Sequence, residues 1–258
     1  MTRSGLAVVL LAGAAVSPLA GQARPAGWLQ ADAFYQNVTN DYGDWKGFGL
    51  RSRVPVGSSD ILFAEAVLQE AFRDEGLWLS FSDRHEWGGD WFTLAGIGGG
   101  TGEFHLPDLR LDGTVGRSWL QRRNLVTLLS GTYVNAKQGY SDALLSGSVA
   151  AFFPGFAFEG GFRINWSSPG DVRTERGFGA VTYGRDRDRV IVLRGSGGYE
   201  GYQLTGTDEV LQKFRSYEGS LSWREWLGGN MGFVVQLDWY DNPSYTRSGA
   251  LIGVFRHW

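Results

Sequence analysis

Charged side chains stand at alternate positions inside apolar stretches of this sequence. In residues 156–166, Glu159, Arg163 and Asn165 alternate with phenylalanine, isoleucine and tryptophan. Charges arranged in this way tune solute selectivity when they line a channel, whereas a dry core would require each one to be paired and hydrogen-bonded. The candidates for lining a water-filled interior are Arg51, Glu65, Arg110, Asp112, Glu159, Arg163, Arg194, Glu218 and Asp238. The alternative is that these charges only pair across neighbouring segments and partly fill the interior.

The histidines are the other residues that could do chemistry, and the sequence contains three: His85, His105 and His257. A histidine beside a serine and a carboxylate can form a hydrolytic site. Ser80 and Ser82 precede His85, and Glu103 and Asp108 flank His105. No spacing here defines a triad, because triads are recognised by geometry rather than by sequence. We therefore expect no catalytic residue, no metal site and no cofactor.

The elements that must position these side chains read as strands. Segments of about ten residues alternate apolar and polar positions and are separated by glycine, aspartate, asparagine and proline. About 14 such segments are predicted, with 12 possible: 28–37, 45–54, 61–72, 77–85, 91–98, 108–119, 125–135, 142–152, 156–166, 174–183, 189–199, 213–223, 231–240 and 245–258. Longer, acidic connections alternate with short ones flanked by arginine, which fits an even-stranded barrel with both termini on one side.

The N-terminal segment differs from the rest of the chain. Arg3 precedes an apolar run from Leu6 to Val16, and small residues at Gly21 and Ala23 form a cleavage pattern. These features predict a secretory signal peptide at residues 1–23 and leave 24–258 as one all-β domain. The sequence has no cysteine, so no disulfide supports that domain, and its net charge of −3 gives no basic face for nucleic acid.

Aromatic residues point to a membrane. Tryptophans cluster near segment ends, where girdles are expected at the two interfaces of a membrane barrel: Trp28, Trp45, Trp78, Trp87, Trp91, Trp119, Trp166, Trp223, Trp226, Trp239 and Trp258. In hydrocarbon every backbone group must be paired, so the sheet must close. We predict a closed antiparallel transmembrane β-barrel in the bacterial outer membrane. Its interior is too wide for side chains alone to fill, and no insertion is long enough for a large plug. The rival fold is a secreted soluble β protein.

The end of the chain carries a resemblance. Ile252, Val254 and Trp258 alternate up to the last residue, and Arg256 departs from the pattern. This ending is similar to the C-terminal signal that the barrel assembly machinery reads in outer-membrane proteins. Together with the Asp-Tyr-Gly-Asp-Trp loop at 41–45, the layout resembles the YaiO family of outer-membrane barrels.

The resemblance implies an envelope role, because some members of that family accompany machinery that makes or exports polysaccharide. We expect a pore or accessory barrel for polar solutes or saccharide export. The expected partners are outer-membrane lipid, lipopolysaccharide, the barrel assembly machinery and polysaccharide-export components, and nucleic acid is not among them. A lipid-modifying or proteolytic outer-membrane enzyme is the alternative function.

Overall fold

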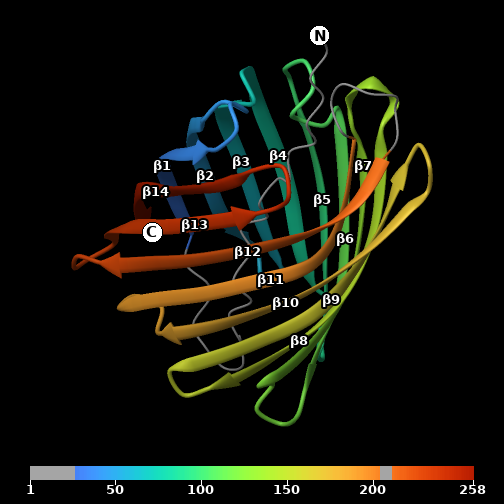
Figure 1. The fold of residues 1–258 in the computed structure, drawn as a ribbon. Helices are drawn as coiled ribbons and strands as arrows, with labels where there is room; N and C mark the ends of the chain where they lie inside the picture. Colours follow the sequence, from blue (N-terminus) through green and yellow to red (C-terminus); the bar gives the residue numbers. More distant parts are fainter. Residues whose placement is uncertain (1–26, 204–210) are drawn as a thin grey trace.

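The computed structural model describes residues 27–203 and 211–258. The predicted signal peptide at 1–23 lies outside these residues. Within them, no helix has the length and apolar character needed to cross a membrane. The described chain forms one sheet that curves round and closes on itself (Figure 1).

Each strand pairs antiparallel with the next along the chain, and β14 pairs with β1 to close the barrel. The strands are β1 (Trp28–Val38), β2 (Trp45–Val56), β3 (Asp60–Ala71), β4 (Asp74–Glu86), β5 (Trp91–Gly100), β6 (Leu109–Trp119), β7 (Leu125–Asn135), β8 (Ser141–Phe153), β9 (Phe156–Ser168), β10 (Val172–Gly184), β11 (Arg189–Gln203), β12 (Leu211–Trp226), β13 (Met231–Asp241) and β14 (Thr246–His257). A short 3₁₀ turn, η1 (Lys137–Gly139), lies between β7 and β8.

The predicted fold class, a closed antiparallel barrel with 14 strands, is confirmed. The largest differences in length are in β4, β11 and β12, which reach 13, 15 and 16 residues where shorter segments were predicted. β11 continues past the predicted end at residue 199 through Glu200 and Gly201, and glycine adds no side chain to an apolar alternation. The backbone ladder between β11 and β12 continues through this region, as far as Gln203 opposite Leu211.

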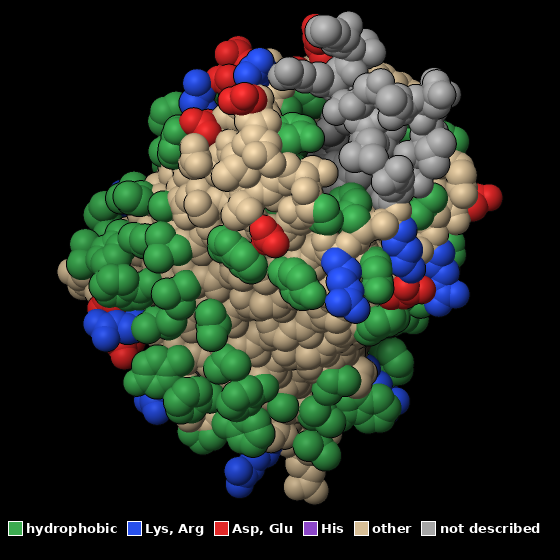
Figure 2. Space-filling view, viewed as in Figure 1, with side chains coloured by type: hydrophobic (Ala, Val, Ile, Leu, Met, Phe, Trp, Pro, Cys, Tyr) green, Lys and Arg blue, Asp and Glu red, His purple; other side chains and the backbone are tan. Residues whose placement is uncertain are grey.

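The outer wall is apolar. Along β9, for example, Phe158, Phe162 and Trp166 are exposed at alternate positions. Hydrophobic side chains are spread over the outer wall in the view of Figure 2. Exposed aromatic residues lie toward both ends of the strands, with Trp91, Trp119 and Trp223 at one end and Tyr133, Trp166, Tyr217 and Trp239 at the other. This band between two aromatic girdles is the surface that a bilayer covers.

Some of the predicted girdle residues lie on the opposite face. Trp45 and Trp78 are buried inside the barrel, and the register places Trp28 opposite His257, with Trp226 opposite Gly232, on the inner wall as well. Assigning all eleven tryptophans to the girdles was therefore wrong for these four. The prediction rested on the position of each tryptophan near a strand end. The face is decided instead by alternation along the strand, and Trp45 lies an even number of residues from the inward Arg51, so it faces inward too.

The two ends of the barrel are distinct. Because the strand number is even, β1 begins and β14 ends at the same end, which we call the terminal end. The opposite end, here the distal end, carries the connections 39–44, 72–73, 101–108, 136–140, 169–171 and 242–245. In outer-membrane barrels the termini lie in the periplasm, so the distal end faces outward from the cell.

Candidate functional site on the inner wall

All nine charged residues singled out from the sequence occupy inward positions in the sheet register. The first group surrounds Arg51, which pairs in register with Gln30 on β1 and Glu65 on β3. Its Nε donates to Glu65 Oε1 at 2.8 Å, and a terminal nitrogen donates to the carboxylate of Asp32. Asp32 was not singled out from the sequence, although it alternates with Ala31 and Ala33 and therefore faces inward.

A second group lies on β6 and β7. Arg110 donates twice to Asp112, at 2.8 and 2.9 Å, and Asp112 also accepts the Thr132 hydroxyl at 2.7 Å. These contacts join residues of one strand or of adjacent strands. The pair therefore lies along the wall rather than across the lumen.

The third group spans β9 to β13. Arg194 lies 3.7 Å from Glu159, and Arg176 lies 3.8 Å from Glu218. Asp238 accepts a hydrogen bond from Gln236 at 2.8 Å on the same strand. Arg176 also pairs with Glu200, and neither of these two residues was singled out from the sequence. Inward parity alone would have found both.

Several of these charged side chains are accessible to water from the barrel interior. The side chains of Glu65 and Asp112 are each 29% exposed, and that of Arg194 is 36% exposed. Their strands turn the other face toward lipid, so this exposure is to the barrel interior. The predicted interior, too wide for side chains to fill, agrees with this geometry.

Several arginines on the inner wall rest on aromatic rings. The guanidinium of Arg163 lies 6.0 Å from the ring of Phe178, Arg84 lies 4.1 Å from Phe92, and Arg247 lies 4.1 Å from Trp45. Arg163 has no hydrogen bond or ion pair within the residues that the structure describes. Cation–π contact occupies the face of a guanidinium and leaves its in-plane N–H groups available.

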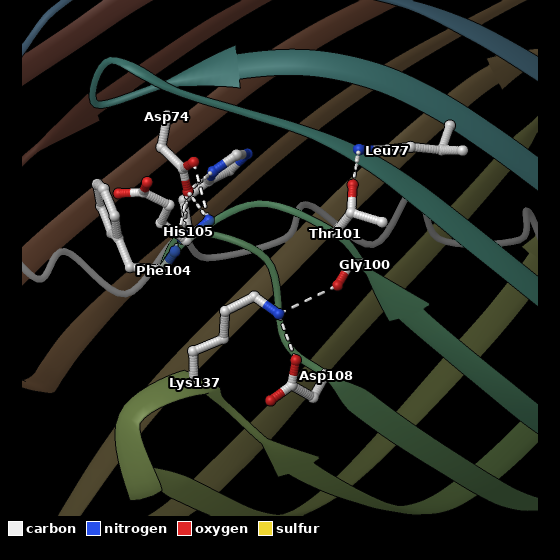
Figure 3. A network of polar contacts seen from close by, with 9 residues as sticks. Asp74, Leu77, Gly100, Thr101, Phe104, His105, Asp108 and Lys137 are labelled. Carbon is white, nitrogen blue, oxygen red and sulfur yellow. Dashed lines mark hydrogen bonds and ion pairs between the residues drawn. The ribbon is translucent and has the colours of Figure 1, made fainter.

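A loop at the distal end folds into the barrel. Leu106, in the 101–108 connection between β5 and β6, is only 1% exposed and packs against Val67 and Trp78 on the inner wall. Figure 3 shows the same loop held on its other side by Lys137, whose Nζ donates to the Gly100 carbonyl at 3.2 Å and to Asp108. The loop narrows the distal opening. It is too short to be the large plug that the sequence analysis argued against.

One carboxylate holds this loop. Asp74, the first residue of β4, accepts the backbone N–H groups of Glu103, Phe104 and His105 at 2.9 to 3.1 Å. The Nδ1 atom of His105 lies 2.7 Å from the same carboxylate (Figure 3). Asp74 and His105 are both buried.

Aromatic residues from neighbouring loops pack beside it. The ring of Phe72 lies 4.9 Å from that of Trp45 and 6.0 Å from that of Tyr245. Tyr240 and Phe104 join the same cluster. We call the 101–108 loop, Asp74 and this aromatic cluster the distal cap. It covers part of the opening from the β13–β14 side to the β7–β8 side.

The histidines do not assemble a hydrolytic site. His85 lies 2.6 Å from Asp60 and faces outward beside Trp87, whereas Ser80 and Ser82 have the opposite parity. His105 belongs to the distal cap, and His257 lies at the terminal end of the barrel. Among the described residues, no group of three or more histidine, aspartate or glutamate side chains is arranged to hold a metal ion.

Two residues of the predicted assembly signal lie on the outer face of β14, and the third, Trp258, directly follows its last residue. Ile252, Val254 and Trp258 are all largely exposed. Arg256 shares their parity and pairs in register with Leu29 and Met231. The backbone N–H of Trp258 donates to the Gly27 carbonyl at 3.1 Å, next to the seam where the sheet closes.

A closed sheet with an apolar outer wall, aromatic girdles and a charged inner wall defines an outer-membrane β-barrel. The particular family follows from a family model: the chain belongs to the YaiO membrane beta barrel domain family, whose model matches residues 28–203. The resemblance noted in the sequence and the predicted outer-membrane location are confirmed.

Comparison with known proteins adds the fold of distant relatives. No curated protein matches the chain. The CymD monoaromatic hydrocarbon channel is similar at 8% identity and a TM-score of 0.61, covering 90% of this chain and 88% of that one. A bacterial polysaccharide outer membrane secretin has 9% identity and a TM-score of 0.54, covering 90% and 98%. The anion-selective porin from Comamonas acidovorans has 10% identity and a TM-score of 0.50, covering 90% and 98%. At these identities the likeness shows the fold alone.

Proposed function

We propose that this barrel is an outer-membrane channel for small polar solutes, narrowed at its distal end by the distal cap. The observation that carries the proposal is the partial exposure of Glu65, Asp112 and Arg194 to the interior, midway along the wall. Charges at this depth are stable only if water reaches them or partners satisfy them fully. Here they keep both a partner and a water-accessible surface.

The arrangement of the ion pairs supports a passage. The pairs formed by Arg51, Arg110 and Arg194 join residues on one strand or on strands one or two places apart. A barrel stabilised only by a filled interior would place such pairs across its axis. Paired charges along the wall instead leave the axis free and present donors and acceptors to a hydrated solute.

Conductance across a planar lipid bilayer tests this function. The purified full-length barrel, refolded in detergent and checked by heat-modifiable migration, should give a small, stable current. Replacing residues 102–107 by a two-residue Gly-Ser link should enlarge the current several-fold, because the inserted loop is gone. Glu103→Gln, a change in an exposed side chain of the same loop that does not hold the loop in place, is the matched control and should leave the current near the wild-type value.

Absence of current from both the wild-type barrel and the shortened variant, with both folded, would contradict a channel. That result would favour a closed accessory barrel of the saccharide-export machinery, tested by co-purification with its components. We also propose that the outer face of β14 is read by the barrel assembly machinery and that lipopolysaccharide surrounds the distal half of the outer wall.

A further inference from the structure

Basic side chains gather on the inner wall at the terminal end. Arg53 on β2 lies opposite Trp28, which lies opposite His257 on β14. Arg224 on β12 reaches past β13 and β14 to donate to Gln30 Oε1 on β1. Arg84 on β4 completes the group. We call Arg53, Arg84, Arg224 and His257 the terminal arginine cluster.

Only one of these groups forms a direct ion pair within the described residues. In the described part of the chain, Arg53 has no hydrogen bond or ion pair, and the hydrogen-bond partner of Arg224 is a neutral amide. Arg84 alone pairs with a carboxylate, that of Glu86 at 2.6 Å. The members lie close enough for their charges to act on one another.

His257 adds an independent sign of a missing partner. Its side chain lies on the inner wall, the residue is only 5% exposed, and neither ring nitrogen has a hydrogen-bond partner within the described residues. The Nε atoms of Arg53 and Arg84 are buried and unpartnered as well. Buried polar groups are normally satisfied, and an unpaired cation away from water is costly. An acceptor with negative charge is the kind of partner that the Nε–H groups of Arg53 and Arg84 and the ring N–H of His257 can donate to.

Aromatic rings hold the guanidinium of Arg224 in place. It lies 4.5 Å from the ring of Phe255 and 5.2 Å from that of Trp28. Stacking of this kind fixes the plane of the guanidinium without occupying its N–H edge, and that edge matches the geometry of an oxyanion. The rings therefore pre-arrange this guanidinium to receive a ligand.

We propose that the terminal arginine cluster binds the oxyanion of a solute, a carboxylate, sulfate or phosphate group, at the periplasmic mouth of the barrel. This inference builds on the proposed channel by naming the charge class that the channel takes. The exposed carboxylate of Asp186, in the turn between β10 and β11, acts on Arg53, Arg224 and His257. The Asp186 carboxylate therefore competes with an incoming anion for these cationic groups.

Titration of the folded barrel in detergent with inorganic phosphate tests the site without requiring any current. Tryptophan fluorescence reports on it, because Trp28 contacts Arg224 and the ring of Trp226 lies 5.5 Å from that of His257. Arg53→Gln and Arg224→Gln should each weaken phosphate binding at least about tenfold, the loss expected for a hydrogen bond to a charged group. Asp186→Asn should tighten it. Arg122→Gln, the same charge change in an exposed turn at the same end, is the matched control and should have no effect.

The ligands identify the source of the oxyanion. Sulfate and glucuronate are titrated beside phosphate, with neutral glucose as the blank, and the ligand that binds most tightly names the group. Equal phosphate affinity in the wild type and in an Arg53→Gln/Arg224→Gln double variant that still migrates as a folded barrel would overturn the inference. Phosphate binding without current would refute the channel but keep the site. Current without phosphate binding, and with a reversal potential in a KCl gradient unchanged by the double variant, would refute the site but keep the channel.

Discussion

Removing the Asp74 carboxylate should open the distal cap. In an Asp74→Ala variant the backbone N–H groups of Glu103, Phe104 and His105 lose their acceptor, and so does His105 Nδ1. Glu103 is exposed and can turn to water, but His105 is buried and Phe104 half-buried. An unsatisfied buried donor costs about 1–3 kcal/mol, so the closed loop loses about 2–5 kcal/mol. Burial of the Leu106 side chain favours the closed loop by about 2 kcal/mol.

The loss from the unsatisfied donors therefore equals or exceeds the stabilisation from Leu106 burial. The loop is expected to leave the lumen while the strands stay paired. Hydrogen exchange should show amide protons 103–105 exchanging at least about thirtyfold faster, the ratio for 2 kcal/mol, and bilayer current should rise. Glu103→Gln, which changes an exposed side chain of the same loop without removing a contact that holds it, serves as control. Unchanged protection of these amides in Asp74→Ala would refute the reasoning that this carboxylate latches the cap.

Three further outcomes are expected. Arg51→Met leaves the buried carboxylate of Asp32 without its cation and should lower the free energy of unfolding in urea and lipid by about 3 kcal/mol; an Arg51→Met/Asp32→Leu double variant should recover most of it, and no recovery would disprove pairing as the cause. The Tyr35 hydroxyl and the Val38 N–H donate to Asp44 and lower its pKa, so the β1–β2 loop should stay ordered above the ordinary value of 3.8 and loosen only as pH falls below it; Asp44→Asn should abolish that transition, seen by limited proteolysis. Deleting Trp258 should reduce the amount of heat-modifiable barrel in cells, whereas deleting it without any change in yield would show that the assembly signal lies elsewhere.

The sequence predicted the wall of the barrel well, because period-two alternation is imposed at every strand by lipid on one side and water on the other. In β9, exposed Phe158 and Phe162 and inward Glu159 and Arg163 follow this rule without exception. The strand ends were less predictable where glycine replaces a side chain, as at Gly201 in the part of β11 beyond the predicted segment. There the neighbouring ladder, not the local sequence, sets the length.

The candidate site was only partly predictable, because its contacts join residues far apart in the chain. His105 and Asp74 are separated by 31 positions, and no periodicity links a loop residue to a strand end. Arg224 meets Gln30 across 194 positions, a contact that exists only once the sheet has closed. Arg53 and Arg224 were not singled out from the sequence, and Arg224 lies beyond the predicted segment 213–223. Their gathering at one end depends on strands brought together by closure.

Closure between β1 and β14 has a consequence for biogenesis. The hydrogen bonds between β1 and β14 join the first and last strands of the domain. Every intermediate with fewer strands therefore exposes two sheet edges with unpaired amides and carbonyls. Such an intermediate has no stable resting place in hydrocarbon. The polypeptide must therefore be shielded in the periplasm until the final hairpin arrives, and insertion should be all-or-none. Any lesion that delays β14 is then expected to produce degraded protein rather than a smaller barrel.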